Sequence, residues 1–166
     1  RTVWSLHFHP QNPQVMFLGT EGSEVYRSND GGEHWQYVST IVNPDAVQMA
    51  FATRILGFAI ESPNPNRMYA ALEVGGAARS ADEGKTWELV NRYFDGNVDL
   101  MDLHGVALGS PRSDVVCIAN RTGVWRSQDG GDHFTPVNTG LPQKPVWKLA
   151  ISPGFAQDGT LLAASQ

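Results

Sequence analysis

An eight-residue pattern, Ser-x-Asp-x-Gly-x-x-aromatic, occurs three times in this 166-residue chain, at residues 28–35, 80–87 and 127–134. We call each copy an octet. The second octet begins 52 residues after the first (28 to 80), and the third begins 47 residues after the second (80 to 127). Repeats at such spacings are typical of folds in which one small unit is stacked many times, because each unit buries its neighbour's face. The octets therefore constrain the fold more than any other feature.

Each octet stands inside a repeated series of short apolar runs that end at Pro, Gly or Asn. In the first unit the runs are 4–9, 15–19, 24–27 and 35–39, which we label strands A, B, C and D. No window shows a helical period, so the runs indicate β-strands. One four-stranded sheet cannot bury both faces alone, and radial stacking of such sheets produces a propeller. We predict an all-β fold, a β-propeller of four-stranded antiparallel blades at residues 1–40, 55–92 and 101–138, with a partial blade at 146–166.

The residue types of the octet suit a tight turn between strands C and D. An Asp carboxylate accepts backbone N–H groups, a Ser hydroxyl closes the same ring of hydrogen bonds, and Gly permits positive φ. The aromatic side chain then packs between sheets. We expect a structural role for these positions, and also for the arginine that precedes each octet. The octet residues are Ser28, Asp30, Gly32, Trp35, Ser80, Asp82, Gly84, Trp87, Ser127, Asp129, Gly131 and Phe134, and the arginines are Arg27, Arg79 and Arg126.

Composition excludes several classes of function. The net charge is −5 with 12 Lys and Arg and no basic stretch, so we expect no nucleic-acid partner. No apolar run approaches the length of a membrane span. Cys117 is the single cysteine, so no disulfide forms within the chain and no cysteine metal site is present. Its apolar neighbours indicate a small core residue.

The octets, in register within a repeated strand pattern, resemble the Asp-box (bacterial neuraminidase) repeat family of β-propellers. That group includes sialidases, the Vps10 domain of sortilin-type receptors, some glucanases and the photosystem II assembly factor of cyanobacteria and plastids. The resemblance implies that the octets lie on the rim opposite the ligand-binding face. It implies ligand binding at the face formed by the B-to-C turns and the D-to-A connections, called the B–C face below. It also favours an extracytoplasmic compartment, which the residues themselves do not determine.

The positions that differ between units are the candidates for a site on the B–C face. The second D-to-A connection, 91–104, combines three carboxylates with a histidine. Such a cluster suits Ca²⁺ or an acid–base pair, and a solvated polar loop is the alternative. Tyr93, Phe94 and Met101 would form an apolar binding patch. The binding-face candidates are Glu21, Glu73, Arg92, Asp95, Asp99, Asp102, His104 and Arg121, of which Glu73, Asp99 and Asp102 are the carboxylates to test for catalysis.

No catalytic set is complete in the sequence. Sialidases use three arginines, a Tyr–Glu pair and an N-terminal Arg-Ile-Pro motif, whereas residues 54–56 read Arg-Ile-Leu. A glucanase needs two carboxylates facing each other across a cleft. His7 and His9 alternate on strand A, where polar residues more often line the channel than bind a metal. We therefore predict no metal site and no cofactor, with Ca²⁺ at residues 91–104 as the exception to test.

Three functional hypotheses follow. The leading one is a module without a complete catalytic set that binds a protein or a glycan at the B–C face. A sialidase- or glucanase-like glycoside hydrolase is the alternative, and an accessory subunit of a larger complex is the third. The chain starts at Arg1 rather than Met and ends after two strands of a fourth unit. We expect further blades from the same polypeptide, from another chain, or from a second copy that closes the ring.

Overall fold

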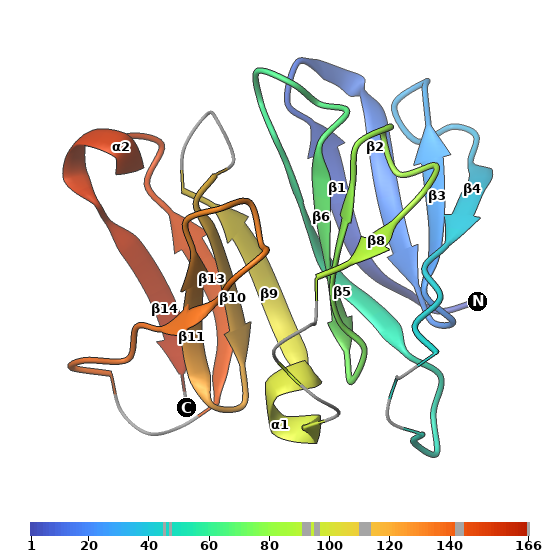
Figure 1. Cartoon of the computed structure of the whole chain (residues 1–166). Helices are drawn as coiled ribbons and strands as arrows, with labels where there is room; N and C mark the ends of the chain where they lie inside the picture. Colours follow the sequence, from blue (N-terminus) through green and yellow to red (C-terminus); the bar gives the residue numbers. More distant parts are fainter. Residues whose placement is uncertain are drawn as a thin grey trace.

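The computed structural model describes residues 1–44, 46, 48–90, 94, 97–109, 114–141 and 145–165. Within these residues the strands form three four-stranded antiparallel sheets and one two-stranded sheet (Figure 1). The predicted all-β fold of four-stranded propeller blades is confirmed. Blade 1 contains β1 (Val3–His9), β2 (Asn12–Thr20), β3 (Glu24–Ser28) and β4 (Gln36–Thr40). Blade 2 contains β5 (Arg54–Ile60), β6 (Met68–Glu73), β7 (Gly76–Ser80) and β8 (Glu88–Leu89). Blade 3 contains β9 (Leu103–Leu108), β10 (Val116–Asn120), β11 (Gly123–Ser127) and β12 (Thr135–Pro136), and blade 4 contains β13 (Val146–Ile151) and β14 (Leu161–Ser165).

The strands of each blade follow chain order, so each sheet is a simple meander. The first strands lie beside one another: β1 contacts β5, β5 contacts β9, and β9 contacts β13. The second strands are the most apolar, and five of the six residues of β6 are buried. This arrangement places all B-to-C turns at one end of the sheets and all octets at the other.

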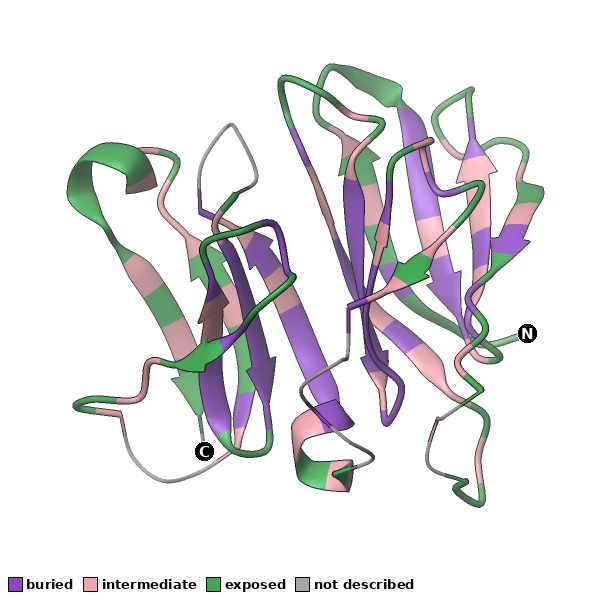
Figure 2. Ribbon diagram, viewed as in Figure 1, coloured by how far each residue is buried: buried purple, intermediate pink, exposed green. Residues whose placement is uncertain are grey.

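The core lies between blades rather than inside one of them, as the buried positions in Figure 2 show. Phe17, Ile55 and Met68 belong to the cluster between blades 1 and 2. Tyr69 and Phe134 belong to the cluster between blades 2 and 3, and a smaller cluster joins blades 3 and 4. Since burying one such side chain stabilises a fold by about 1.5–3 kcal/mol, each blade depends on its neighbours for stability.

The octets have the hydrogen bonds that the sequence predicts. In the second octet the Ser80 hydroxyl accepts the Gly84 N–H at 2.9 Å and donates to Asp82 Oδ1 at 2.8 Å. Asp82 Oδ1 also accepts the Thr86 N–H at 2.9 Å. The fifth position of the octet, a glycine in all three copies, is left-handed throughout, with φ of 97°, 81° and 98° at Gly32, Gly84 and Gly131. The first and third octets repeat these contacts.

One octet position is more constrained than the pattern suggests. Glu83 occupies the place of Gly31 and Gly130, which the sequence pattern leaves free, yet its φ is 59°. A non-glycine residue in this region carries strain of about 1–2 kcal/mol. Its carboxylate contacts Arg27 of blade 1 at 2.5 Å.

The aromatic residues of the octets differ in burial. Phe134 is buried between blades 2 and 3, and Trp87 is partly buried between blades 1 and 2. The Trp87 indole N–H also donates to the Ser39 hydroxyl and to the Gly84 carbonyl, at 3.1 and 3.0 Å. Trp35 lies outside both clusters. The predicted packing between sheets therefore applies to Trp87 and Phe134 among the described octets.

Two single-turn helices lie in connections where the sequence shows no helical period. α1 (Val98–Met101) precedes β9, and Asn97 caps it by accepting the backbone N–H groups of Asp99 and Leu100. α2 (Phe155–Asp158) lies between β13 and β14. One turn is too short to produce a periodic pattern, which is why both were missed. Across the described residues, no helix has the length and apolar character needed to cross a membrane.

Cys117 lies in β10 and is 2% exposed, as expected for a core residue. Burial raises the pKa of its thiol to about 11, against a smaller opposing effect of Arg126. The thiol is therefore protonated at neutral pH and has little nucleophilic character.

Candidate functional site

The B–C face is the end of the sheets that carries α1 and the N-terminus, at the lower side of Figure 1. Here every first strand has an interruption in its pairing. Register shifts occur between Val3 and Ser5, between Ile55 and Gly57, and between Val146 and Lys148, and the β9–β10 pairing skips one residue after Leu103. A β-bulge of this kind re-aims the extra side chain. The bulged residues are Trp4, Leu56, His104 and Trp147.

The first cluster on this face is centred on Arg54, at the start of β5. Its guanidinium carbon lies 4.3 Å from the ring centroid of Trp4 and 4.3 Å from that of Phe51. Its Nη1 donates to Glu73 Oε2 at 2.9 Å. Glu21 joins the cluster through an isolated backbone bridge to Arg54. The cluster is therefore an arginine held between two aromatic rings and one carboxylate, which are contacts that hold a cation in one place.

The second cluster is centred on Asp102 and His104, between α1 and β9. His104 Nε2 lies 3.6 Å from Asp102 Oδ2, and its Nδ1 lies 2.9 Å from the Val146 carbonyl oxygen. Arg121 Nε lies 3.4 Å from Asp99 Oδ1 and 4.0 Å from Asp102 Oδ2. Trp147 stacks on His104 with centroids 4.2 Å apart and an interplanar angle of 20°. Four sequence candidates thus come together with a tryptophan that the sequence reasoning did not select.

Two buried polar atoms of these clusters have no hydrogen-bond partner among the described residues: Asp102 Oδ1 and Arg54 Nε. A buried donor or acceptor without a partner costs about 1–3 kcal/mol. One is an acceptor and the other a donor.

The predicted site residues separate into two groups. Glu21 and Glu73 belong to the Arg54 cluster, while Asp99, Asp102, His104 and Arg121 form the other. Arg92 and Asp95 lie outside the described residues.

The predicted apolar patch at 93–101 is wrong in its described members. Phe94 and Met101 are 1% and 2% exposed and belong to the core between blades 2 and 3. They are buried because α1 folds Met101 inward, and Phe94 packs against Phe134 at a centroid distance of 5.9 Å. Tyr93 lies outside the described residues.

Phe51, Arg54 and Trp147 are not among the predicted site residues, and Trp4 is expected only as apolar surface under the accessory-subunit hypothesis. The repeat carries a signal for both tryptophans, because Trp4 and Trp147 occupy the same place in strand A of their units. Arg54 was set aside as an incomplete motif. No local pattern marks the bulge itself, since it depends on pairing with the second strand.

The described residues contain no group of three His, Cys, Asp or Glu side chains that would hold a metal ion. His7 Nε2 accepts the Phe58 N–H at 3.2 Å, and His9 Nδ1 accepts the backbone N–H groups of Gln11 and Asn12. Each histidine thus has a role within the fold. The Ca²⁺ hypothesis at 91–104 stays a prediction, because Asp95 is outside the described residues.

A hollow of about 370 Å³ lies at the opposite end of the sheets, where β5, β9 and β13 end. It is lined by Glu61, Leu108, Ile151 and Phe155 among others. Glu61 is 4% exposed and lies 3.5 Å from Arg67. None of the candidate residues of the B–C face lines this hollow.

No protein-family model matches the sequence, and no curated protein does. Solved structures do match. A Niastella koreensis GH74 enzyme is 18% identical with a TM-score of 0.70, over 98% of this chain and 26% of that one. YCF48 bound to D1 peptide is 14% identical with a TM-score of 0.59, over 81% of this chain and 39% of that one. A GH74 xyloglucanase from Xanthomonas campestris is 24% identical with a TM-score of 0.56, over 86% and 21%.

At these identities the likeness is one of fold. The chain spans between 21% and 39% of the length of these three β-propeller proteins. The chain is thus structurally similar to part of a β-propeller, as its three four-stranded sheets and its two-stranded sheet already indicate.

Proposed function

We propose that this chain is part of a larger Asp-box β-propeller and that it binds a protein segment at its B–C face. The observation that carries the proposal is a pair of tryptophans at repeated bulges. Trp4 and Trp147 are each 43% exposed, yet each is held by a stacked neighbour, Arg54 or His104. Exposed aromatic rings that are already fixed bind a partner at a low cost in conformational entropy.

The residue types on this face suit a protein partner. Tryptophan and arginine are enriched among the residues that dominate binding energy at protein interfaces.

The likeness to YCF48 agrees with this proposal, since that propeller was solved with a D1 peptide bound. The two proteins share a fold at 14% identity, so the D1 peptide is a first probe for this chain and not an assigned ligand.

A glycan-directed function is the second candidate. Exposed tryptophan rings also stack on sugar faces, and two of the similar structures are GH74 enzymes. A hydrolase requires two carboxylates flanking the scissile bond. Here Glu73 is paired with Arg54, and Asp99 and Asp102 both approach Arg121. Carboxylates engaged by arginines favour binding over hydrolysis, and an accessory role in a complex is one form of such binding.

The test is binding of a labelled D1 peptide and of an array of short peptides, measured by fluorescence anisotropy. For any peptide that binds, Trp147→Ala and Trp4→Ala should each weaken affinity roughly tenfold or more. Tyr37→Ala is the matched control, because Tyr37 is an exposed aromatic residue on the outer strand β4. Xyloglucan oligosaccharides serve as the second set of probes.

Two outcomes would contradict the proposal. If the peptide affinity is equal in the parent chain and in both tryptophan variants, the peptide binds outside the surface of Trp4 and Trp147. Release of reducing sugar from xyloglucan, lost in Asp102→Asn, would assign the face to hydrolysis instead.

A further inference from the structure

A second hollow, of about 390 Å³, lies at the octet end of blade 2. All of its lining residues belong to blade 2, which has a neighbouring blade on both faces. The lining includes Arg67, Tyr69, Arg79, Ala81, Thr86 and Trp87. Because small-molecule sites usually have volumes of about 300–1,000 Å³, this hollow is large enough for a small ligand.

Two residues of this hollow depart from the repeat. In the register of the sheets, Arg67 of blade 2 takes the place of a valine in blades 1 and 3. Tyr69 takes the place of Phe17 in blade 1 and of Cys117 in blade 3. The other two blades form the same four-stranded sheet without this arginine and this hydroxyl. The repeat therefore does not require them, and both residues are candidates for a role beyond the fold.

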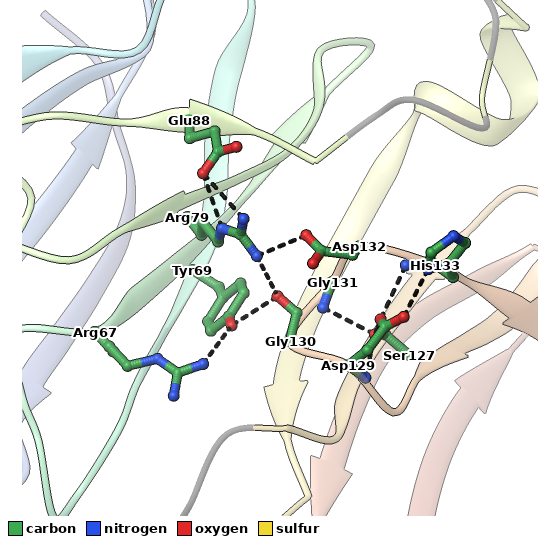
Figure 3. Close-up of polar contacts among 10 residues, drawn as sticks. All are labelled: Arg67, Tyr69, Arg79, Glu88, Ser127, Asp129, Gly130, Gly131, Asp132 and His133. Atoms are coloured by element: carbon green, nitrogen blue, oxygen red, sulfur yellow. Dashed lines mark hydrogen bonds and ion pairs between the residues drawn. The ribbon is translucent and has the colours of Figure 1, made fainter.

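Arg67 has N–H groups without acceptors. Its Nε lies 3.5 Å from Glu61 Oε2, and its Nη2 donates to the Tyr69 hydroxyl at 3.4 Å (Figure 3). Both distances are long for contacts of this kind. Within the described part of the chain, Nη1 of Arg67 has no hydrogen-bond acceptor, and the side chain is 34% exposed. Since a guanidinium presents its N–H groups in one plane, Arg67 can donate two of them to one ligand group in the hollow.

Arg79 supplies a second guanidinium group close to Arg67. Its Nη1 donates to the Gly130 carbonyl of blade 3 at 3.1 Å, and the Tyr69 hydroxyl donates to the same carbonyl at 2.9 Å. A methyl group on Gly130 would lie 3.4 Å from Arg67 Nη2 and 4.0 Å from Arg79 Nη1. The two guanidinium groups therefore lie near one another, with the Tyr69 hydroxyl bonded to the first and to the acceptor of the second.

The carboxylates near the two arginines are already engaged. Arg79 donates from Nε to Glu88 at 3.0 Å and from Nη1 to Asp132 at 2.9 Å. Glu88 is the only carboxylate in the described lining, and in Figure 3 it lies beyond Arg79, away from Arg67. Arg79 is therefore fixed in place, and the Arg67 end of the hollow presents hydrogen-bond donors.

We propose that this hollow binds a small organic anion through a carboxylate or phosphate group. Arg67 donates two N–H groups to the oxyanion, and Arg79 contributes the second positive charge. The planar fork of an arginine matches the geometry of both oxyanions. The body of the ligand packs against Ala81 and Trp87, which line the same hollow. The inference does not depend on what the B–C face binds, because the octets lie at the other end of the sheets.

The probes are phenyl phosphate and benzoate, which carry the same apolar ring on the two oxyanions. Titration of the 166-residue chain, followed by amide NMR, should shift the signals of Ala81 and Thr86, which line the hollow. We expect a Kd of about 1 mM or below for the tighter probe, and that probe identifies the oxyanion. Inorganic phosphate should bind more weakly than phenyl phosphate, because it has no ring to bury.

Variants of Arg67 test its role directly. Arg67→Gln should weaken binding of the tighter probe roughly tenfold or more, because charge-assisted hydrogen bonds are lost. Arg67→Lys keeps the charge but loses the fork, so it should also bind more weakly than the parent, and it replaces the first variant if that one fails to fold. Arg27→Gln is the matched control. Arg27 has the place of Arg79 in blade 1 and contacts Glu83 of the next blade, but Val15 stands where blade 2 has Arg67.

Three results would overturn the proposal. Neither probe shifts the signals of Ala81 and Thr86; or the tighter probe binds equally well to the parent and to the folded Arg67 variants; or Arg27→Gln weakens binding as much as Arg67→Gln does. The last result would indicate a general effect of charge rather than a site at Arg67.

Discussion

Single residues decide how each C-to-D turn closes. Ser and Asp side chains replace backbone partners in the octets, so a turn that bends too sharply for ladder hydrogen bonds still satisfies its N–H groups. The hydroxyl and the carboxylate are coupled, because Ser80 donates to Asp82 at 2.8 Å. Removing either the hydroxyl or the carboxylate therefore also removes a hydrogen bond of the other group.

Ser80→Ala should lower the free energy of unfolding by about 1–3 kcal/mol. Ser80 is 4% exposed, and its removal leaves the buried Gly84 N–H without an acceptor. Urea unfolding measures the change. Ser62→Ala, at an exposed serine in the connection after β5, should stay within about 0.5 kcal/mol of the parent. A Ser80→Ala variant that also stays within about 0.5 kcal/mol of the parent would show that the octet hydroxyl is dispensable.

The octet carboxylates should make stability depend on acid pH. The Ser127 hydroxyl and the His133 backbone N–H lower the pKa of Asp129 from 3.8 to about 2. The pKa of Asp30 is also lowered, first by the His34 backbone N–H and then by Ser28. For Asp82, burial acts to raise the pKa, but hydrogen bonds from Thr86 and Ser80 outweigh it and lower the pKa.

A carboxyl whose pKa is lower in the folded state than in the unfolded state stabilises the fold above the unfolded value. This stability is therefore complete above about pH 4 and is lost as the pH falls towards about 2. Urea midpoints across this range measure the loss. Asp129→Asn should reduce the dependence of the urea midpoint on pH. A variant whose midpoint depends on pH as steeply as that of the parent would contradict the role of Asp129 in this stability.

The sheets are held together by the side chains that pack between them. Phe134, the aromatic residue of the third octet, contacts Phe94 and joins the core of blades 2 and 3. Blade 3 therefore packs against blade 2 partly through the ring of Phe134. Trp87 has the same place between blades 1 and 2, where its ring lies 6.1 Å from that of Phe58.

Phe134→Ala should cost about 3–5 kcal/mol, since it removes a buried ring and leaves a cavity between two sheets. The change is measured by thermal and urea unfolding. Phe8→Ala is the matched control, because Phe8 is 58% exposed in β1 and should cost far less. Similar costs at the two positions would mean that Phe134 does not hold blades 2 and 3 together.

At the scale of the whole molecule, stability should vary along the array of blades. Blade 2 has a neighbour on both faces, and five of the six residues of β6 are buried. By contrast, β14 is an edge strand of a two-stranded sheet, and none of its residues is buried. Stacked repeats depend on nearest-neighbour interfaces, so the middle of the array should open least often.

Hydrogen exchange followed by mass spectrometry should therefore find the slowest amide exchange in β6 and β10 and the fastest strand exchange in β14. Leu103→Ala, at a fully buried position between blades 2 and 3, should accelerate exchange in blade 3 more than in β1. Uniform exchange in all four blades would indicate a single cooperative unit instead.

The sequence by itself determined the octet turns, the strand order and the all-β fold. These features depend on residues that are close in the chain: within one octet the Ser hydroxyl and the Asp carboxylate bond to each other and accept backbone N–H groups of the turn. Because the same unit recurs along the chain, the structure predicted for one unit also predicts the array of blades.

Only the tertiary structure decided the composition of the candidate site. The Arg54 cluster joins residues of blades 1 and 2, and the stack of His104 on Trp147 joins blades 3 and 4. Phe94 and Met101 were expected at the surface and are buried, because the direction of a side chain in a connection depends on which blade it packs against. Contacts between blades depend on how neighbouring sheets pack against each other, and the spacing of residues along the chain does not predict this packing.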